Sequence, residues 1–154
     1  MSHIVETLEV DVPVRTAYDQ WTQFESFPMF MDGVEHVVQI DDVTLVWRAR
    51  IAGVTKEWQA RIIEQTPDER IAWSSTDGAM NAGVVTFEPI DDERCRVTLQ
   101  LDVEPADPIE AVGDSLGLVR RQAVADLHNF KTFIETRREE TGAWRGEIVG
   151  GGVR

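Results

Sequence analysis

The sequence predicts an α+β fold in which a curved seven-stranded antiparallel sheet surrounds a long C-terminal helix, with two short helices between strands one and two. Between residues 34 and 103, apolar residues recur at every second position, the period of half-buried strands. From Pro108 to about Glu140 they recur at steps of three and four, the period of an amphipathic helix. The 154 residues, 42% hydrophobic and 28% charged, fit one domain with a full core.

The first strand and the two short helices are predicted from a change of period at a proline. Alternating apolar residues run from Ile4 to Val12, and Pro13 then sets a boundary, since proline is tolerated in a first helical turn. A second short helical piece, residues 25–31, is interrupted by Pro28 and closes at the turn Asp32-Gly33. The first helix is predicted from apolar residues at helical spacing: Val14, Ala17, Tyr18, Trp21 and Phe24.

The six remaining strands are separated by clusters of Asp, Gly and Pro. Such short turn-forming clusters join neighbouring strands, so the sheet is predicted to be an antiparallel meander. The acidic pairs Asp41-Asp42 and Asp91-Asp92 fall in these turns and are interpreted as solvated turn residues. The predicted strands are Val34–Ile40, Val43–Ala52, Val54–Gln65, Arg70–Thr76, Asn81–Pro89 and Arg94–Val103.

One long helix and a tail complete the chain. Residues 1–140 are predicted to form a single domain, and residues 141–154 a glycine-rich tail without regular structure that docks through Trp144. The apolar stripe of the helix consists of Ile109, Val112, Leu116, Val119, Ala123, Leu127, Phe130 and Ile134.

Residue parity divides the sheet into an apolar face, toward the helix, and a polar face toward water. On this parity His36, which alternates with Val34 and Val38, is predicted to face inward. The predicted inner residues are Leu45, Trp47, Ala49, Ile51, Trp58, Ala60, Ile62, Ile71, Trp73, Val85, Phe87, Cys95, Val97, Leu99 and Leu101.

Small residues leave two interpretations open for the space between helix and sheet. Ala49, Ala60 and Ala123, with Gly113 and Gly117, either border a cavity or allow close packing of helix on strand. Arg120 lies on the apolar side of the helical wheel. Its guanidinium is expected either to meet an inward carboxylate such as Glu6, to reach a pocket and a polar ligand group, or to extend to solvent.

Composition excludes several partner classes. With 28 acidic against 15 basic residues, the net charge of −13 disfavours nucleic acid and anionic membrane surfaces. No apolar run is long enough to span a membrane, and the start lacks the features of a signal peptide, so a cytoplasmic protein is expected. Cys95 is interpreted as a buried structural thiol. No spacing resembles a metal site, a phosphate loop or a nucleophile elbow, so neither metal nor cofactor is expected.

The order of elements and several local motifs resemble the polyketide cyclase/dehydrase and lipid-transport superfamily (START/SRPBCC), which has the helix-grip fold. The likeness covers nearly the whole chain to about Glu140. Because that superfamily includes aromatase/cyclases, sterol and phospholipid carriers, coenzyme Q-binding proteins and plant hormone receptors, it implies a fold more than one function. The matching motifs are Val12-Pro13-Val14, Ala17-Tyr18, Trp21, Phe24, Phe27-Pro28, Phe30, Gly33-Val34, Val84 to Phe87, Arg96 to Leu99, and Phe130-Lys131 with Phe133-Ile134.

The resemblance implies an elongated apolar cavity between the long helix and the sheet, opening near the short helices. Cyclases of the superfamily use an inward arginine, so Arg120 is the candidate catalytic residue. The sheet arginines Arg48, Arg50 and Arg61 fall on the polar parity, a departure from the cyclase pattern. The resemblance places Phe27, Met29, Phe30 and Met31 at the mouth, and Trp47, Trp58, Trp73, Phe87, Leu116, Arg120 and Val124 along the walls.

Three function classes follow. The leading hypothesis is a monomer or homodimer that binds a hydrophobic small molecule such as a polyketide, lipid or isoprenoid, with Arg120 orienting its polar end. This needs only an enclosed apolar volume and one or two polar groups. The alternative is a polyketide aromatase/cyclase or dehydrase that catalyses aldol cyclisation, which needs a base and a donor for the enolate. Glu6, His36 and Tyr18 are the other candidates for these roles. A protein-interaction module is the third class.

Overall fold

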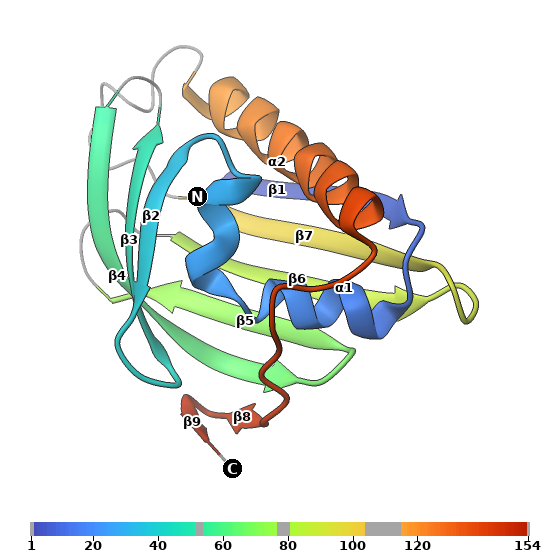
Figure 1. The fold of residues 1–154 in the computed structure, drawn as a ribbon. Helices are drawn as coiled ribbons and strands as arrows, with labels where there is room; N and C mark the ends of the chain where they lie inside the picture. The colour runs from blue at the N-terminus through green and yellow to red at the C-terminus, as the bar shows by residue number, and fades with distance from the viewer. Residues whose placement is uncertain (1, 52–53, 77–80, 104–114, 154) are drawn as a thin grey trace.

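The predicted α+β architecture is confirmed by the computed structural model, which describes residues 2–51, 54–76, 81–103 and 115–153 (Figure 1). At the ends of several elements, and over residues 115–119, only the backbone is described. The long helix lies across the inner side of a curved sheet, and the short helices lie beside it. The elements are β1 (Ser2–Val10), α1 (Val14–Trp21), the 3-10 helix η1 (Phe24–Met29), β2 (Val34–Gln39), β3 (Thr44–Ile51), β4 (Val54–Thr66), β5 (Arg70–Ser75), β6 (Asn81–Pro89), β7 (Cys95–Val103), α2 (Ser115–Arg137), β8 (Ile148–Val149) and β9 (Gly152–Val153).

The sheet has nine strands where seven were predicted. The path β1-β7-β6-β5-β4-β3-β2 contains the seven predicted strands, all antiparallel to their neighbours. The two additional strands are short and come from the glycine-rich segment after residue 140. β4 extends past the end of β3, and Ile148 of β8 pairs with Gln65 on that extension. Gly150 and Gly151 both have positive φ and turn the chain into β9.

Parity correctly predicts the inner face of β3 to β7. Its apolar side chains are buried under α2 and the short helices, and α2 contributes Ala123, Leu127, Phe130 and Ile134 to the same core. Outer arginines such as Arg70 instead meet carboxylates, with Arg70 Nε 3.3 Å from Glu64 Oε2. The buried inner residues are Leu45, Ala49, Ala60, Ile62, Ile71, Val85, Phe87, Cys95, Val97 and Leu99.

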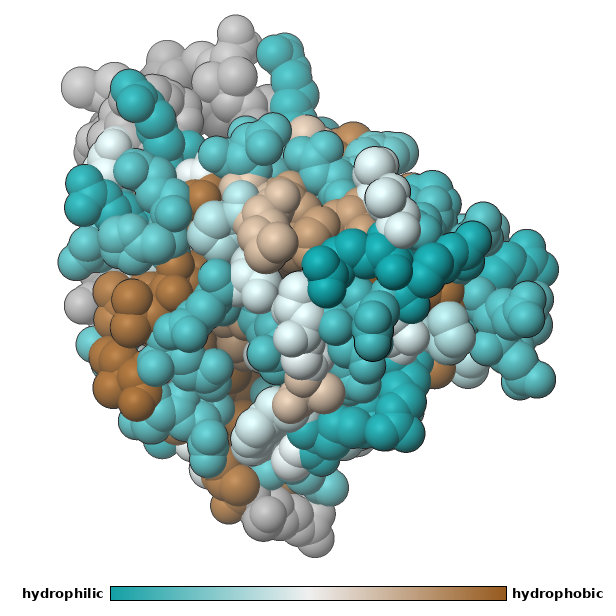
Figure 2. Space-filling view, in the orientation of Figure 1, coloured by the Kyte–Doolittle hydropathy of each residue, from teal (hydrophilic) through white to brown (hydrophobic). Residues whose placement is uncertain are grey.

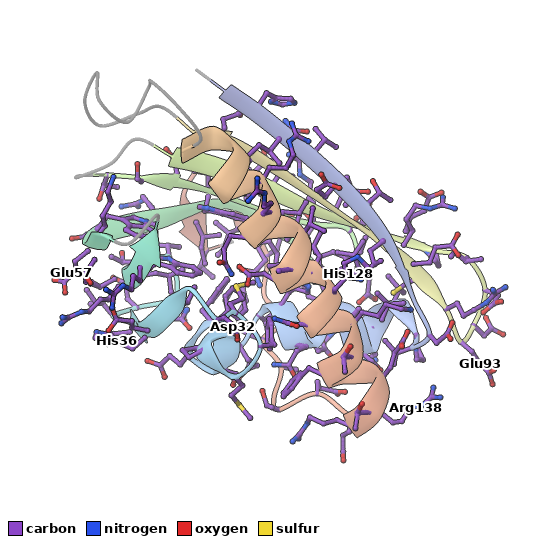
Figure 3. All side chains as sticks on the ribbon, turned by 90° about the horizontal axis from the view of Figure 1, so that it is seen from above. Asp32, His36, Glu57, Glu93, His128 and Arg138 are labelled. Atoms are coloured by element: carbon purple, nitrogen blue, oxygen red, sulfur yellow. The ribbon has the colours of Figure 1, made fainter. Side chains whose placement is uncertain are left out.

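The inward orientation predicted for His36 is wrong. A register shift between Val34 and His36 moves the strand by one position, so Val37 points inward opposite Trp47 and is buried. His36, Val38 and Ile40 are exposed instead. Figure 3 shows His36 far from α2, and Figure 2 shows apolar surface gathered on the side of the molecule where β2 lies.

The helices begin and end at residues with specific backbone roles. Pro13 caps α1, and its carbonyl accepts from the N–H of Ala17. The Thr22 hydroxyl donates to the Asp19 carbonyl at 2.6 Å, so α1 ends before Phe24, earlier than predicted. α2 is described from Ser115 to Arg137, and the predicted first turns at 108–114 lie outside the described residues. No helix in the described ranges is long and apolar enough to cross a membrane.

Residues 141–153, here called the C-terminal strap, run from the end of α2 past α1 to β4 (Figure 1). The strap is bonded to α1: Thr141 and the Gln20 side chain exchange two hydrogen bonds, and the Trp144 N–H donates to Thr22 Oγ1 at 3.0 Å. At its far end the Gly151 carbonyl accepts from Arg61 Nη2 at 2.8 Å. Trp144 packs against the core.

Candidate functional site

The inner face of the sheet has a closed end beside α1. Here Ile71, Val85 and Val97 are fully buried, and the Tyr18 ring of α1 meets Phe87 edge to face with centroids 5.4 Å apart. Burial raises the pKa of the Tyr18 hydroxyl to about 12, and that of the Cys95 thiol on β7 to about 11. Both groups are therefore neutral at physiological pH, and neither is activated as a base or nucleophile.

The other end of the inner face carries three half-buried tryptophans. Trp47 and Trp58 are cross-strand neighbours with parallel rings, 3° apart in orientation and 6.2 Å between centroids. The Trp73 indole lies on Gly83 of β6, where an added Cβ would approach its Cζ2 to 2.3 Å. Glycine at 83 thus allows the ring to lie flat on the sheet. Together the three indoles form a half-buried aromatic surface, here called the tryptophan face.

Trp47 also carries a buried polar group. The Trp47 Nε1–H is buried and finds no acceptor among the described residues. A buried N–H without an acceptor costs about 1–3 kcal/mol. An acceptor oxygen on a bound molecule would satisfy it.

The short helix η1 covers the edge of this face with a cluster of phenylalanines. Phe27 is its centre, with ring centroids 5.2 to 5.6 Å from those of Trp21, Phe24, Phe30 and Trp47. Phe27, Phe30 and Met31 are buried, whereas the Met29 side chain is 60% exposed. Pro28 therefore separates the buried Phe27 from the exposed Met29.

The structure does not place Arg120 in the interior. Its side chain is 54% exposed and its Nη1 lies 3.4 Å from Oε1 of Glu6, on the inner parity of β1. Of the three alternatives for Arg120, the structure therefore shows the pairing with Glu6, at the seam between α2 and the edge strand, with the side chain more than half exposed to solvent. Val124 is half-buried, and the side chain of Leu116 lies outside the described residues.

Asp126, which the sequence patterns do not single out, is a half-buried carboxylate beside the inner stripe of α2. It accepts from Gln122 Nε2 at 2.8 Å and from the backbone N–H of Asp32, in the connection between η1 and β2. The Asp32 side chain in turn lies 3.4 Å from Asn129 Nδ2. Figure 3 shows Asp32 beside the middle of α2. The signal in the sequence is its position, three residues after Ala123 and four before Phe130.

Burial raises the pKa of Asp126 to about 6, and the nearby Asp32 carboxylate adds to the rise, while the Gln122 hydrogen bond opposes it. A folded-state pKa above the ordinary value means that the folded protein binds this proton more tightly than the unfolded chain does. Its contribution to stability is therefore present below about pH 4 and is lost as the pH rises toward 6.

We expect Asp126→Asn to be more stable than the wild type by about 2 kcal/mol at pH 7.5 and equally stable at pH 4. Urea unfolding across this pH range measures the difference. Asp42→Asn in the exposed β2–β3 turn serves as the control and should show no such divergence. Parallel pH curves for wild type and Asp126→Asn would contradict the assignment.

Comparisons with known proteins agree with the architecture. The model of the polyketide cyclase/dehydrase and lipid transport family matches residues 10–134. An uncharacterized 17.2 kDa protein of Streptomyces lincolnensis, from the melC2-rnhH intergenic region, is 53% identical over 150 residues, covering 97% of this chain and all of the relative. The crystal structure of the Zhui aromatase/cyclase from Streptomyces sp. R1128 has a TM-score of 0.79 at 19% identity, over 93% of this chain and 99% of that one. A START superfamily protein from Mycobacterium smegmatis has a TM-score of 0.69 at 17% identity, over 88% and 95% of the two chains.

Proposed function

Since the chain belongs to the polyketide cyclase/dehydrase and lipid transport family, we propose that it binds a hydrophobic small molecule between α2 and the tryptophan face. The observation that carries this proposal is the contrast within one sheet face. The end beside α1 is fully buried, while the three indoles at the other end stay half-buried. Large apolar side chains that keep solvent contact on a concave face are typical of ligand sites.

A bound molecule would cover apolar surface there and would also make a polar contact. Apolar surface removed from water contributes about 25 cal/mol per Å², so covering the three indoles supplies the main driving force. The enclosed Trp47 Nε1–H would orient the guest by donating to a carbonyl, ether or hydroxyl oxygen. We assign the first recognition contact to this donor rather than to Arg120, because Arg120 is exposed and paired with Glu6.

The remaining predicted wall and mouth residues take roles that follow from their positions. Phe27 and Phe30 hold the edge of the site by packing on Trp47 and α2. Met29, exposed beside them, would contact the part of the guest nearest solvent. Phe87 belongs to the closed end, where it supports Tyr18. The exposed Arg120 would meet a polar end of the guest at the α2–β1 seam, and Val124 would line the helix side.

The alternative is a cyclase or dehydrase role, and Asp126 is the observation that favours it. Aldol closure needs a group that removes a proton next to a carbonyl, and a carboxylate whose pKa is raised to about 6 is suited to that task near neutral pH. If turnover of a poly-ketone is lost in Asp126→Asn while binding persists, the enzymatic role is supported. Arg120→Ala tests, in the same assay, the arginine that the family resemblance implies as catalytic.

Titration with N-phenyl-1-naphthylamine, an uncharged apolar fluorophore, tests the binding proposal. We expect its emission to rise and to saturate at one equivalent. Trp47→Phe keeps the ring but removes the donor, and for a guest with an acceptor oxygen, such as a naphthyl ketone, it should weaken binding about 3- to 10-fold. The same variant with N-phenyl-1-naphthylamine, which has no acceptor oxygen, is the matched control, with an expected change in affinity below about two-fold. Absence of saturable binding by the wild type would overturn the proposal.

A further inference from the structure

Of the four buried polar or charged side chains of the described residues, three bond to the C-terminal strap, and the fourth belongs to the β4 residue that pairs with it. They are Asp19, Gln20, Thr22 and Gln65. The first three lie at the end of α1 or just after it, and each bonds to a strap residue, while Gln65 is the β4 partner of Ile148. Burying a polar group without a partner is costly, so this side of α1 is suited to the strap and not to water.

Arg145 is the strongest of these contacts. Its guanidinium bridges two carboxylates, Asp19 of α1 and Asp68 in the β4–β5 turn, with Nη2 to Asp68 Oδ2 at 2.8 Å. It also lies over the Tyr18 ring, 5.4 Å from the centroid. Its side chain is 26% exposed and that of Asp19 is 2% exposed. The strap thus fixes α1 to the sheet through one side chain.

A continuous chain of aromatic contacts leads from α1 to the tryptophan face. Trp21 of α1 meets Phe27 of η1 at 5.2 Å between centroids, and Phe27 meets Trp47 at 5.6 Å. Trp47 then lies parallel to Trp58. A shift of α1 would therefore move the rings that support the proposed ligand site, because packed aromatic side chains transmit displacement to their neighbours.

We propose that Arg145 is a positioning residue for the ligand site, acting through α1 and η1 on Trp47. This inference rests on the proposed binding function and adds to it a coupling between the strap and the guest. The coupling is reciprocal: an attached strap tightens guest binding, and a bound guest holds the strap in place by the same factor. The residue lies beyond the 10–134 region that the family model matches.

Arg96 on the outer face of the sheet offers a closely matched control. It too lies between two carboxylates, Glu9 at 3.3 Å and Glu88 at 3.6 Å, but it is 41% exposed and lies on the outer face of β7, whereas α1 packs on the inner face of that strand. Arg145→Ala and Arg96→Ala thus remove the same side chain from the same kind of arrangement. Only the first is connected to α1.

The experiment measures N-phenyl-1-naphthylamine affinity for wild type, Arg145→Ala, Arg145→Lys and Arg96→Ala at a temperature where urea curves show each variant folded. We expect Arg145→Ala to weaken binding by at least about five-fold and Arg96→Ala by less than about two-fold. Lysine restores the charge but cannot bond to both carboxylates as the guanidinium does. The affinity of Arg145→Lys should therefore lie between those of the wild type and Arg145→Ala. Unchanged affinity in Arg145→Ala would overturn the inference while leaving the binding function intact.

Amide exchange in the wild type supplies a second measurement that needs no variant. The backbone N–H of Trp144 donates to Thr22 Oγ1. Its exchange with solvent should slow by at least about five-fold when the fluorophore is bound. Exchange that does not change on binding overturns the coupling even if Arg145→Ala fails to fold. If the wild type itself does not bind the fluorophore, the proposed function fails first, and the inference fails with it.

Discussion

Phe27→Ala is expected to lower the free energy of unfolding by about 3–5 kcal/mol, the usual cost of deleting a buried phenylalanine. Phe27 is buried, and its ring contacts four other aromatic rings, which come from α1, η1, the residue after η1, and β3. Removing it leaves a cavity that stiff neighbouring rings cannot fill. Urea unfolding monitored by circular dichroism gives the value.

Met29→Ala is the matched control within the same short helix. Because Met29 is mostly exposed, its truncation should change stability by less than about 0.5 kcal/mol. Similar losses at both positions would mean that η1 does not hold Phe27 inward as described.

Arg145→Ala is expected to cost about 2–4 kcal/mol of stability. Removing the guanidinium leaves the buried Asp19 carboxylate without its main partner, and an uncompensated buried charge is strongly destabilising. Burial already raises the pKa of Asp19, and the Arg145 hydrogen bond opposes that rise. The loss should therefore be smaller at low pH, where Asp19 is protonated.

Arg96→Ala, with its guanidinium near the surface, should cost less than about 1 kcal/mol. Thermal and urea unfolding of both variants at pH 7.5 and pH 4 measure the difference. Equal small losses would show that the Asp19–Arg145–Asp68 contact does not stabilise the fold.

The alternation of apolar residues was sufficient to predict seven strands and the inner face, because a sheet with one covered face must keep its hydrophobic residues on one parity. The same rule gave the wrong orientation for His36 because a single register shift in β2 reverses which residues face inward. The local sequence does not mark the position of that shift. The second helical piece was predicted despite Pro28, and the structure has it as the 3-10 helix η1 with Pro28 inside it.

The strap and Asp126 could not be predicted by pattern alone. The tail is rich in glycine, and its order comes from contacts more than 70 residues away in sequence, such as Arg145 with Asp68. Asp126 lies beside an apolar stripe with Gln122 one helical turn away, yet only the fold brings Asp32 to it. Arg120 was assigned to the apolar side by the helical wheel, but Glu6 on the edge strand holds it at the surface.

The most direct test of guest binding on the tryptophan face is a two-dimensional NMR titration of the indole N–H signals. The chain has five tryptophans, each with one such signal. On adding N-phenyl-1-naphthylamine, we predict shifts at Trp47, Trp58 and Trp73 that saturate at one equivalent, with Trp144 moving least. Signals that stay unchanged, or shifts confined to Trp144, would contradict the account.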